Sequence, residues 1–267
     1  MTHWSPIAAL LGCAGGLLAG CTSASRAVPT SQPTWTYDQG GIVRGDVSQP
    51  RVALVFTGGD YGEGTAHILD VLQAAGIKAS FFVTGAYIAH PEYAPLLRRI
   101  VAEGHYLGPH SDAHLLYCAW EDRGQLLVTE DEFRKDLERN IAALRRFGAL
   151  RGRRPIYFIP PYEWFNAHQV RWARAMGVVL FNFTPGSGSN RDWIPEGQRG
   201  FVSSETILNG ILACERRDPH GLNGFLLLLH LGSQRQDKMH VQLRPLVETL
   251  AGRGYTFVRV DELLAPG

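Results

Sequence analysis

Two histidines spaced four residues apart are the first candidates for chemistry in this sequence. His110 and His114 enclose the segment His-Ser-Asp-Ala-His. Imidazoles at this spacing can share one face of a helical turn and converge on a single divalent cation. The chain has ten histidines, so chance alone would often produce such a pair. The pair therefore gains meaning only together with the other reactive side chains of the sequence.

Five further groups that could bind a metal or move a proton stand after apolar segments. They are Asp60, Glu63, Glu163, Asp192 and His230. Carboxylates and imidazoles are the side chains that most often act as general acids and bases, and they also ligate divalent cations. Polar groups after several successive apolar segments are harder to attribute to chance than one histidine pair.

The elements that must position these residues are of two alternating kinds: short apolar runs, which predict strands, and segments with helical spacing of apolar residues, which predict helices. Short apolar runs bounded by turn residues predict seven strands, at Arg51–Thr57, Ala79–Thr84, His105–Pro109, Ile156–Ile159, Val178–Thr184, Gly224–Leu231 and Thr256–Val260. Helical spacing predicts helices that include Ile68–Leu72 and Pro95–Val101, and others at Glu130–Phe147, Ala167–Met176, Glu205–Arg216 and His240–Arg253.

Strands that alternate with helices predict an α/β fold with a parallel sheet. An open doubly wound sheet and a closed barrel both fit this order of elements. The glycine-rich dinucleotide fingerprint does not follow the first strand, which argues against a nucleotide-binding sheet. In a barrel, the chemistry would lie at the carboxyl ends of the strands, where the candidate residues fall.

The overall charge excludes one class of partner. The chain has 26 basic and 25 acidic residues and a formal net charge of +1. Such a balance provides no field that would attract nucleic acid, so we expect no nucleic-acid partner.

The first residues predict export. The apolar stretch from Ile7 to Ala19 is too short to span a bilayer as a helix, and it leads to Leu-Ala-Gly-Cys at Cys21. This ending resembles the bacterial lipobox, although no Lys or Arg precedes the stretch, and the alternative is an uncleaved signal. We expect a lipoprotein signal peptide over 1–21, a lipid on Cys21, and a membrane-anchored protein facing the periplasm or the cell exterior. A flexible tether over 22–47 and a catalytic domain over 48–267 would follow.

Two cysteines remain in the expected domain. Cys118 and Cys214 are nearly a hundred residues apart, and neither has a metal-ligand spacing. In an oxidising compartment they could form a disulfide, but two free buried thiols fit the sequence equally well.

In their order along the chain, the candidate segments resemble the motifs of the polysaccharide deacetylases, which include chitin, peptidoglycan and acetylxylan deacetylases. The matches are His110–His114 to H-(S/T)-x-x-H, Ile159–Tyr162 to part of R-x-P-Y, Ser189–Trp193 to D-x-x-D-W with serine first, and Leu228–His230 to L-x-L-H. The resemblance covers roughly residues 48–264 and implies a distorted (β/α)7 barrel.

The sequence departs from the family in two motifs. The family usually reads T-F-D-D-G, where one aspartate is the general base and the next binds the metal, but this chain has Phe-Thr-Gly-Gly at 56–59. The arginine that steadies the base in the family is Ile159 here. Because both partners are missing together, we infer that the base has moved. Glu163, at a position where the family usually has glycine, is our candidate, and Glu63 is its rival.

The resemblance implies a mechanism for the remaining residues. A divalent cation, zinc with cobalt or nickel as alternatives, would bind His110 and His114, with Asp60 as the third ligand. The backbone N–H of Tyr162 would help to hold the tetrahedral oxyanion. His230, tuned by Asp192, would protonate the leaving group. Aromatic side chains near such a site also stack on sugar rings, so Trp164 and Trp193 are our candidates for substrate binding.

Three functions follow from this reading. The first is metal-dependent hydrolysis of N- or O-linked acetyl groups on an acetylated oligo- or polysaccharide of the cell envelope. In the second, a protein of the same fold hydrolyses another amide, such as a cyclic amide. The third is a catalytically silent lipoprotein that binds glycan, which the loss of the two motif aspartates would favour.

Overall fold

The computed structural model describes residues 35–152 and 155–265. The signal segment, the lipobox cysteine Cys21 and the first part of the expected tether lie outside these residues. Within the described ranges, no helix combines the length and apolarity needed to cross a bilayer.

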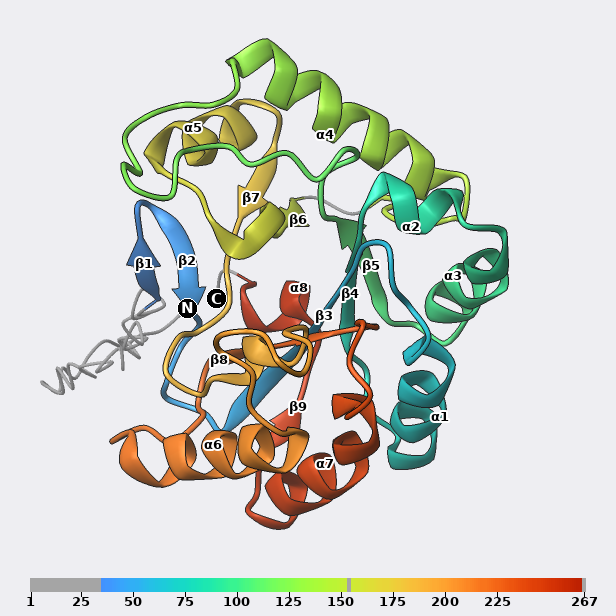
Figure 1. Ribbon diagram of the computed structural model, residues 1–267, viewed down its shortest axis with the longest axis vertical. Coiled ribbons are helices and arrows are strands. Elements are labelled where there is room, and N and C mark those ends of the chain that lie inside the picture. Colours follow the sequence, from blue (N-terminus) through green and yellow to red (C-terminus); the bar gives the residue numbers. More distant parts are fainter. Residues whose placement is uncertain (1–34, 153–154, 266–267) are drawn as a thin grey trace, which may run out of the picture. The chain divides into compact units, whose positions relative to one another are not determined.

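A parallel sheet forms the centre of the fold (Figure 1). Its strands, in spatial order, are β5 (Tyr106–Pro109), β4 (Ser80–Val83), β3 (Arg51–Gly58) and β8 (Phe225–His230), and β9 (Thr256–Phe257) also pairs with β3. Strands β6 (Ile156–Phe158) and β7 (Val178–Leu180) form a second parallel pair. Strand β3 is buried from Val52 to Gly58, as expected of a strand covered on both faces.

Polar contacts link the two groups of strands into a distorted barrel. Past the end of β7, the backbone N–H of Thr184 donates to Leu226 of β8 at 3.0 Å. On the other side, the hydroxyl of Tyr106 in β5 accepts the N–H of Tyr157 in β6 at 2.8 Å. The barrel is therefore irregular between β5 and β6, where the Tyr106 hydroxyl takes the place of a backbone acceptor in the hydrogen bonds between strands.

Helices surround the strands in Figure 1. They are α1 (Thr65–Ala75), α2 (Gly85–Ala89), α3 (Ala94–Ala102), α4 (Glu130–Arg145), α5 (Ala167–Ala175), α6 (Ser204–Arg217), α7 (Leu243–Gly252) and α8 (Val260–Leu263). Four short 3-10 turns are η1 (Pro91–Tyr93), η2 (Pro161–Glu163), η3 (Ser189–Arg191) and η4 (Met239–Gln242). All seven predicted strands and all six predicted helices are present, so the expected alternation is confirmed.

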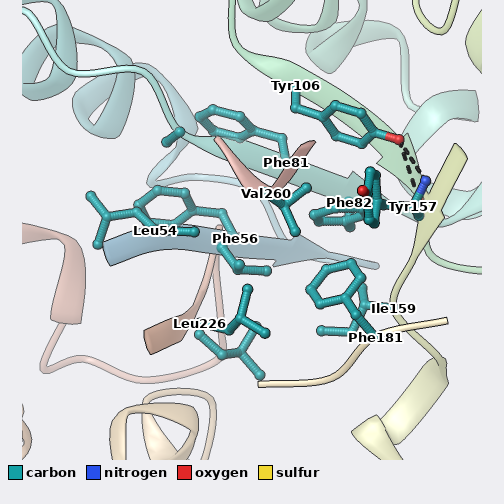
Figure 2. Close-up of a cluster of buried hydrophobic side chains, with 14 of the residues drawn as sticks. Leu54, Phe56, Phe81, Phe82, Tyr106, Tyr157, Ile159, Phe181, Leu226 and Val260 are labelled. Carbon is teal, nitrogen blue, oxygen red and sulfur yellow. Dashed lines mark hydrogen bonds between the residues drawn. The ribbon is translucent and has the colours of Figure 1, made fainter. Parts of the chain in front are cut away.

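The main core lies on both faces of the central sheet, inside the barrel and between the strands and the helices. Figure 2 shows the rings of Phe81, Phe82, Tyr106 and Phe181 in one cluster with Val260 of α8. These side chains are all fully buried. The N–H of Val260 donates to the Ser80 hydroxyl at 2.8 Å, which fixes the start of α8 against the first residue of β4. The last predicted strand ends early for this reason, because Val260 begins a helix and does not extend β9.

The prediction of a flexible tether over 22–47 is wrong for its second half. Strands β1 (Thr36–Asp38) and β2 (Gly41–Arg44) form an antiparallel hairpin. Both turn residues, Gln39 and Gly40, have positive φ, as a two-residue primed turn requires. The N–H of Asn182 then donates to Ile42 at 2.7 Å, so the hairpin docks on the barrel beside β7.

The two cysteines of the domain are both buried and free. The alternative of a disulfide between Cys118 and Cys214 is therefore excluded.

Candidate active site

The candidate residues gather at the carboxyl ends of the parallel strands. Thr57 of β3 pairs with Phe82 of β4 on one side and with His230 of β8 on the other. Residues paired across neighbouring parallel strands point to the same face of a sheet. The ring of Phe82 packs against Phe181, at a centroid separation of 5.1 Å, inside the barrel. Thr57 and His230 therefore project into the barrel mouth.

The loop that carries the two histidines is held by α4. Asp136 accepts hydrogen bonds from the Ser111 hydroxyl at 2.6 Å and from the N–H of Ala113 at 2.8 Å. Asn140, one turn further along, accepts the N–H of His110 at 3.1 Å. Because the loop residue Ser111 has φ of 72°, these bonds hold a backbone conformation that a non-glycine residue rarely adopts.

His110 has the environment of a metal ligand. Its Nδ1 lies 2.9 Å from the carbonyl oxygen of Ile159, so Nδ1 carries the proton and Nε2 keeps the lone pair. Burial, together with the neighbouring His114 and His230, holds the pKa of His110 well below its usual range. The ring is therefore neutral at physiological pH, which is the form that ligates a cation.

His114 lies beside His110, with ring centroids 5.1 Å apart. Burial lowers the pKa of His114 to about 4, although the charge of Asp60 acts in the opposite direction. Asp60 is therefore near enough to interact electrostatically with this imidazole, while its own side chain is exposed. Both histidines are neutral and adjacent, as the prediction of a shared cation requires.

The predicted three-ligand set is not assembled. Among residues 35–152 and 155–265, no three His, Cys, Asp or Glu side chains lie close enough together to hold a metal ion. The two imidazoles fit a divalent cation because they are neutral and because the bond from His110 Nδ1 to the Ile159 carbonyl oxygen leaves Nε2 free to ligate. Asp60 does not converge with them in this structure.

Glu163 and Tyr162 occupy a strained turn after β6. Their φ values are 52° and 57°, in the left-handed region that non-glycine residues seldom occupy. The Asn182 amide donates to the Glu163 carbonyl oxygen at 2.7 Å and helps to hold this backbone. The ring of Tyr162 lies 4.4 Å from that of His114, between centroids, so this turn borders the histidine pair.

The environment of Glu163 is that of a catalytic base. Desolvation raises the pKa of Glu163 to about 7, even though the nearby His230 lowers it, and Asp192 adds to the rise. A general base is most effective when its pKa is near the working pH. The carboxylate accepts no hydrogen bond from any described residue, so its lone pairs are free to bind a water proton.

Glu63, the rival base, is engaged elsewhere. Its Oε1 lies 2.5 Å from Nζ of Lys238 and accepts the N–H of Ser233 at 3.0 Å. Burial alone would raise the pKa of Glu63, but these donors and the lysine charge lower it below its usual value. A carboxylate held in an ion pair with a lowered pKa is a weak base, so the geometry favours Glu163.

His230 and Asp192 form a hydrogen-bonded pair. Nδ1 of His230 lies 2.6 Å from Oδ1 of Asp192. Burial alone lowers the pKa of His230, but the Asp192 charge and hydrogen bond, with the charge of Glu163, outweigh it and raise the pKa above its usual value. The Nε2 atom of His230 can therefore carry a proton at neutral pH, as a general acid must.

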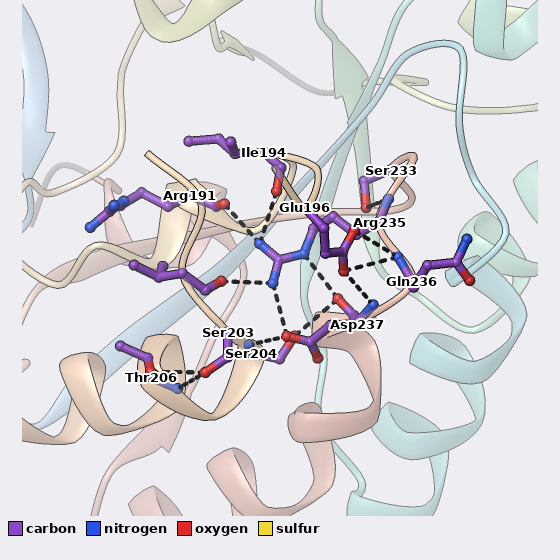
Figure 3. A network of polar contacts seen from close by, with 11 residues as sticks. Arg191, Ile194, Glu196, Ser203, Ser204, Thr206, Ser233, Arg235, Gln236 and Asp237 are labelled. Atoms are coloured by element: carbon purple, nitrogen blue, oxygen red, sulfur yellow. Dashed lines mark hydrogen bonds and ion pairs between the residues drawn. The ribbon is translucent and has the colours of Figure 1, made fainter. Parts of the chain in front are cut away.

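A buried guanidinium holds the loop that carries Asp192 (Figure 3). Arg235 donates to the carbonyl oxygens of Arg191 at 3.2 Å, Ile194 at 3.3 Å and Val202 at 2.8 Å. Its side chain is fully buried and also pairs with Asp237 at 3.1 Å. Because Arg191 directly precedes Asp192, this arginine fixes the position of the carboxylate that contacts His230.

The altered first motif leaves two features at the end of β3. The hydroxyl of Thr57 is buried and has no hydrogen-bond partner among the described residues. A Cβ on Gly58 would lie 2.8 Å from Leu231 and 2.9 Å from the ring of Tyr87, closer than real Cβ contacts. Position 57 therefore keeps a small polar group, and position 58 accepts no side chain without rearrangement.

Exposed aromatic rings surround the site. Trp193, the residue after Asp192, is half exposed, and so is the Tyr162 ring. Trp164 is partly buried and stacks on Trp120, with centroids 5.5 Å apart. Trp120 also contacts the Tyr162 ring, so Trp164 is linked to the site through Trp120, while Trp193 directly follows Asp192 in the chain.

Sequence reasoning missed the residues that support the loops. Asp136 and Asn140 are polar but lie on the buried face of α4, among Phe133, Leu137 and Leu144. A polar residue that interrupts an apolar helical stripe is the signal that could have found them. Arg235 gave no comparable signal.

Comparisons with known proteins agree with this geometry. The family model for polysaccharide deacetylase matches residues 44–181. A peptidoglycan-N-acetylglucosamine deacetylase of Bacillus cereus is 27% identical over 232 residues, which are 86% of this chain and 74% of that protein.

Solved structures are similar in fold. A peptidoglycan N-acetylglucosamine deacetylase, 27% identical, superposes with a TM-score of 0.64 over 83% of this chain and 91% of its own. A family 4 carbohydrate esterase pseudoenzyme from Bacillus anthracis, 20% identical, has a TM-score of 0.66 over 85% of this chain and 70% of its own. A mutant of that pseudoenzyme has restored enzymatic activity. The (β/α)7 barrel of these esterases is thus also the fold of this chain.

Proposed function

This chain belongs to the polysaccharide deacetylase family, and we propose that it is a hydrolase that removes acetyl groups from a glycan of acetylated amino sugars. The observation that carries the proposal is the arrangement of Glu163 and the Asp192–His230 pair around one barrel mouth. The pKa of Glu163 is raised to about 7 and that of His230 is raised above its usual value. A carboxylate base and an imidazolium acid beside one site are what amide or ester hydrolysis requires.

Glu163 begins the reaction as the general base. Its carboxylate takes a proton from a water molecule, and the water oxygen attacks the acetyl carbonyl carbon. The carbonyl π electrons move to oxygen, and the N–H of Tyr162 donates a hydrogen bond to the resulting oxyanion.

His230 completes the reaction as the general acid. When the tetrahedral intermediate collapses, the bond from carbon to the sugar nitrogen or oxygen breaks. The proton on Nε2 of His230 goes to that leaving atom, which is released as an amine or alcohol. Asp192, bound to Nδ1, keeps the ring oriented and stabilises its charged form, so the proton is available at neutral pH.

We assign metal binding to His110 and His114 alone, because Asp60, the predicted third ligand, does not converge with them among the described residues. The neutral state of both rings and the bond from His110 to Ile159 support this assignment. When bound, a divalent cation such as zinc, cobalt or nickel would polarise the acetyl carbonyl and lower the pKa of water.

The substrate and the location are proposed on separate grounds. The relative from Bacillus cereus acts on N-acetylglucosamine in peptidoglycan, which favours an N-linked acetyl group here as well. The lipobox at Cys21 supports export and anchoring by a lipid, so the substrate would be a glycan of the cell envelope.

A silent glycan-binding protein is the second candidate. The absence of a three-ligand cluster in the described ranges favours it, and so does the unpartnered hydroxyl of Thr57 at the position of the missing aspartate. A pseudoenzyme with this fold is known in Bacillus anthracis.

Acetate release distinguishes the two candidates. Purified protein without its signal segment is incubated with chitooligosaccharides, peptidoglycan and acetylated xylan, with and without added zinc, cobalt or nickel. Release of acetate by the parent protein and its loss in Glu163→Gln support the proposed hydrolase. Glycan binding without acetate release from any of the three substrates supports the silent binder.

A further inference from the structure

The net charge of +1 conceals an uneven distribution of charge between the two ends of the barrel. Each helix that joins two parallel strands runs back along the sheet, so its last turn and the loop after it lie at the amino end of the next strand. Six exposed arginines, which we call the basic arc, stand in these positions before β6, β7 and β8: Arg145, Arg146, Arg151, Arg174, Arg216 and Arg217. The basic arc therefore lies at the end of the barrel opposite the candidate active site.

Helix dipoles do not account for the whole basic arc. A dipole favours a cation in the last turn of a helix, as Arg174 is placed in α5. Arg151, however, lies in the loop beyond the end of α4, outside any helix. The density of positive charge at this end is thus greater than the helices alone require.

Neighbouring carboxylates do not neutralise the basic arc. None of its six side chains forms an ion pair with a residue that the structure describes. Two acidic residues at the same end are paired with other arginines, Asp218 with Arg44 at 2.7 Å and Glu215 with Arg253 at 2.6 Å. An exposed set of unpaired guanidinium groups produces a positive local field, which attracts an anionic partner.

The chain enters the domain at this same end. Thr36, the first residue of β1, pairs with Arg44 of β2. Arg44 donates to the carbonyl oxygens of Gly221 and Asn223, both at 2.9 Å, in the loop between α6 and β8. Cys21, the expected lipid site, precedes Thr36 by fifteen residues, which span at most about 50 Å. A lipid on Cys21 would therefore keep the domain within that distance of a bilayer.

A phospholipid surface suits the basic arc better than a single bound anion. Strands β6 and β7 pair with each other, and the segment after β7 bonds to β8, so the six arginines precede three neighbouring strands. They are thus spread around one end of the barrel and do not converge on one point. The headgroups of an anionic bilayer present many phosphates over one plane, and a guanidinium binds phosphate oxygens through several N–H donors.

We propose that the basic arc binds the anionic phospholipid headgroups of the membrane that carries the lipid anchor. An anchor limits the distance of the domain from the bilayer but does not orient it. Contact through the basic arc would turn the carboxyl ends of the strands, and with them the candidate active site, away from the bilayer. The inference shares the proposed export with the preceding section, but it does not depend on hydrolysis.

The test measures binding of the domain to vesicles without its anchor. Residues 32–267 form a compact unit of their own, so this fragment can be used. It should bind vesicles of phosphatidylcholine that contain about 30% phosphatidylglycerol, and it should not bind vesicles of phosphatidylcholine alone. Binding should weaken as the salt concentration rises, because ions screen the attraction between exposed charges.

A triple variant removes half of the basic arc. It combines Arg145→Gln, Arg146→Gln and Arg151→Gln in one protein. A basic residue near an anionic surface contributes about fivefold in affinity, so the partition constant for the phosphatidylglycerol vesicles should fall roughly hundredfold.

A matched control removes the same charge from the opposite end. Arg134→Gln and Lys135→Gln lie near the start of α4, and Arg199→Gln lies in the loop after η3. This control should bind the vesicles within about twofold of the parent, because its basic arc is intact. An equal loss in both triple variants would show that only net charge matters, and it would overturn the proposal.

Two further outcomes would also overturn the membrane contact. One is failure of the parent to bind phosphatidylglycerol vesicles, or equal binding to vesicles of phosphatidylcholine alone. The other is binding of soluble polyphosphate by the parent without binding of vesicles, which would identify an anionic polymer as the partner.

Urea denaturation shows whether the triple variant of the basic arc is folded, since its midpoint should equal that of the parent. If the midpoint is lower, Arg216→Gln with Arg217→Gln replaces the triple variant, and the expected loss of vesicle binding is about thirtyfold. Acetate release from soluble tetra-N-acetylchitotetraose should be unchanged in either variant. Vesicle binding through the basic arc without acetate release by the parent would support this inference and contradict the hydrolase. Acetate release without vesicle binding would support the hydrolase and contradict this inference.

Discussion

Asp192 contacts His230 through both of its carboxylate oxygens. Oδ1 lies 2.6 Å from Nδ1 of the imidazole, and Oδ2 accepts the backbone N–H of His230 at 2.8 Å. Asp192 is 3% exposed, so water competes little for either bond. One carboxylate thus fixes both the ring and the strand end that carries it.

Replacement of Asp192 by asparagine should remove most of the general-acid activity. The neutral amide no longer raises the pKa of His230, so burial lowers that pKa and the ring loses its proton near neutral pH. We expect kcat to fall by about 10²–10⁴, the usual contribution of a positioned acid. Steady-state kinetics at pH 7 measure the loss, and an unchanged kcat would contradict the role of the pair.

The pH profile of kcat/KM should be bell-shaped in the parent protein. Glu163 acts only when ionised, so activity should fall as the pH drops below about 7, the raised pKa of this group. His230 acts only when protonated, so activity should fall as the pH rises through its raised pKa. Glu163→Gln should remove the acidic limb together with most of the activity. An acidic limb near pH 4 would argue that another, unperturbed carboxylate is the base.

Loss of either histidine should remove bound metal without unfolding the protein. His110→Ala and His114→Ala each take away one of the two neutral imidazoles, so we expect metal content to fall from stoichiometric to near zero. Inductively coupled plasma mass spectrometry after dialysis measures the content. His168→Ala is a matched control, because this histidine lies on α5 outside the site and should leave metal content intact.

Asp136 should contribute to stability through the histidine loop. In Asp136→Asn, an amide NH₂ replaces one acceptor and faces a donor from the loop, either the Ser111 hydroxyl or the N–H of Ala113. An unsatisfied buried donor costs about 1–3 kcal/mol, so the free energy of unfolding should fall by that amount. Urea denaturation measures it. Glu138→Gln, an exposed position on the same helix, should change stability by less than about 0.5 kcal/mol.

Arg235 should affect both stability and turnover. Arg235→Met leaves carbonyl oxygens of Arg191, Ile194 and Val202 without their donor, so we expect a loss of roughly 3–5 kcal/mol in stability, as for a broken buried ion pair. Turnover at a temperature where the variant is folded should also fall, since the loop that carries Asp192 is released. Full kcat in the folded variant would show that the loop holds its position without Arg235.

The alternation of strands and helices could be predicted because each long central strand is a continuous run of apolar residues. Continuous apolar runs such as 51–57 and 224–231 become strands buried on both faces, and the strand ends locate the site. The hairpin at 36–44 could not be predicted in this way. Its strands have three and four residues, too few to show a period, and its stability comes from docking of Ile42 and Val43 on the barrel.

The candidate site residues could be predicted only in part, for a related reason. The order of motifs identified His110, His114, Asp192 and His230, but it could not choose between Glu163 and Glu63. That choice depends on Lys238, which is 175 residues from Glu63 in the chain and 2.5 Å from it in space. Long-range pairing of this kind leaves no local pattern in a single sequence.

The packing around Gly58 limits which residue can stand at this position. Tyr87 and Leu231 occupy the space that an aspartate at position 58 would need, with contacts of 2.9 and 2.8 Å to its first side-chain atom. A single substitution back to the family's aspartate therefore meets a steric barrier before any ligand is regained. Prior shrinkage of Tyr87 or Leu231 would open a cavity in a fully buried region and lower stability. An aspartate at position 58 would therefore call for a compensating change in the packing around the end of β3.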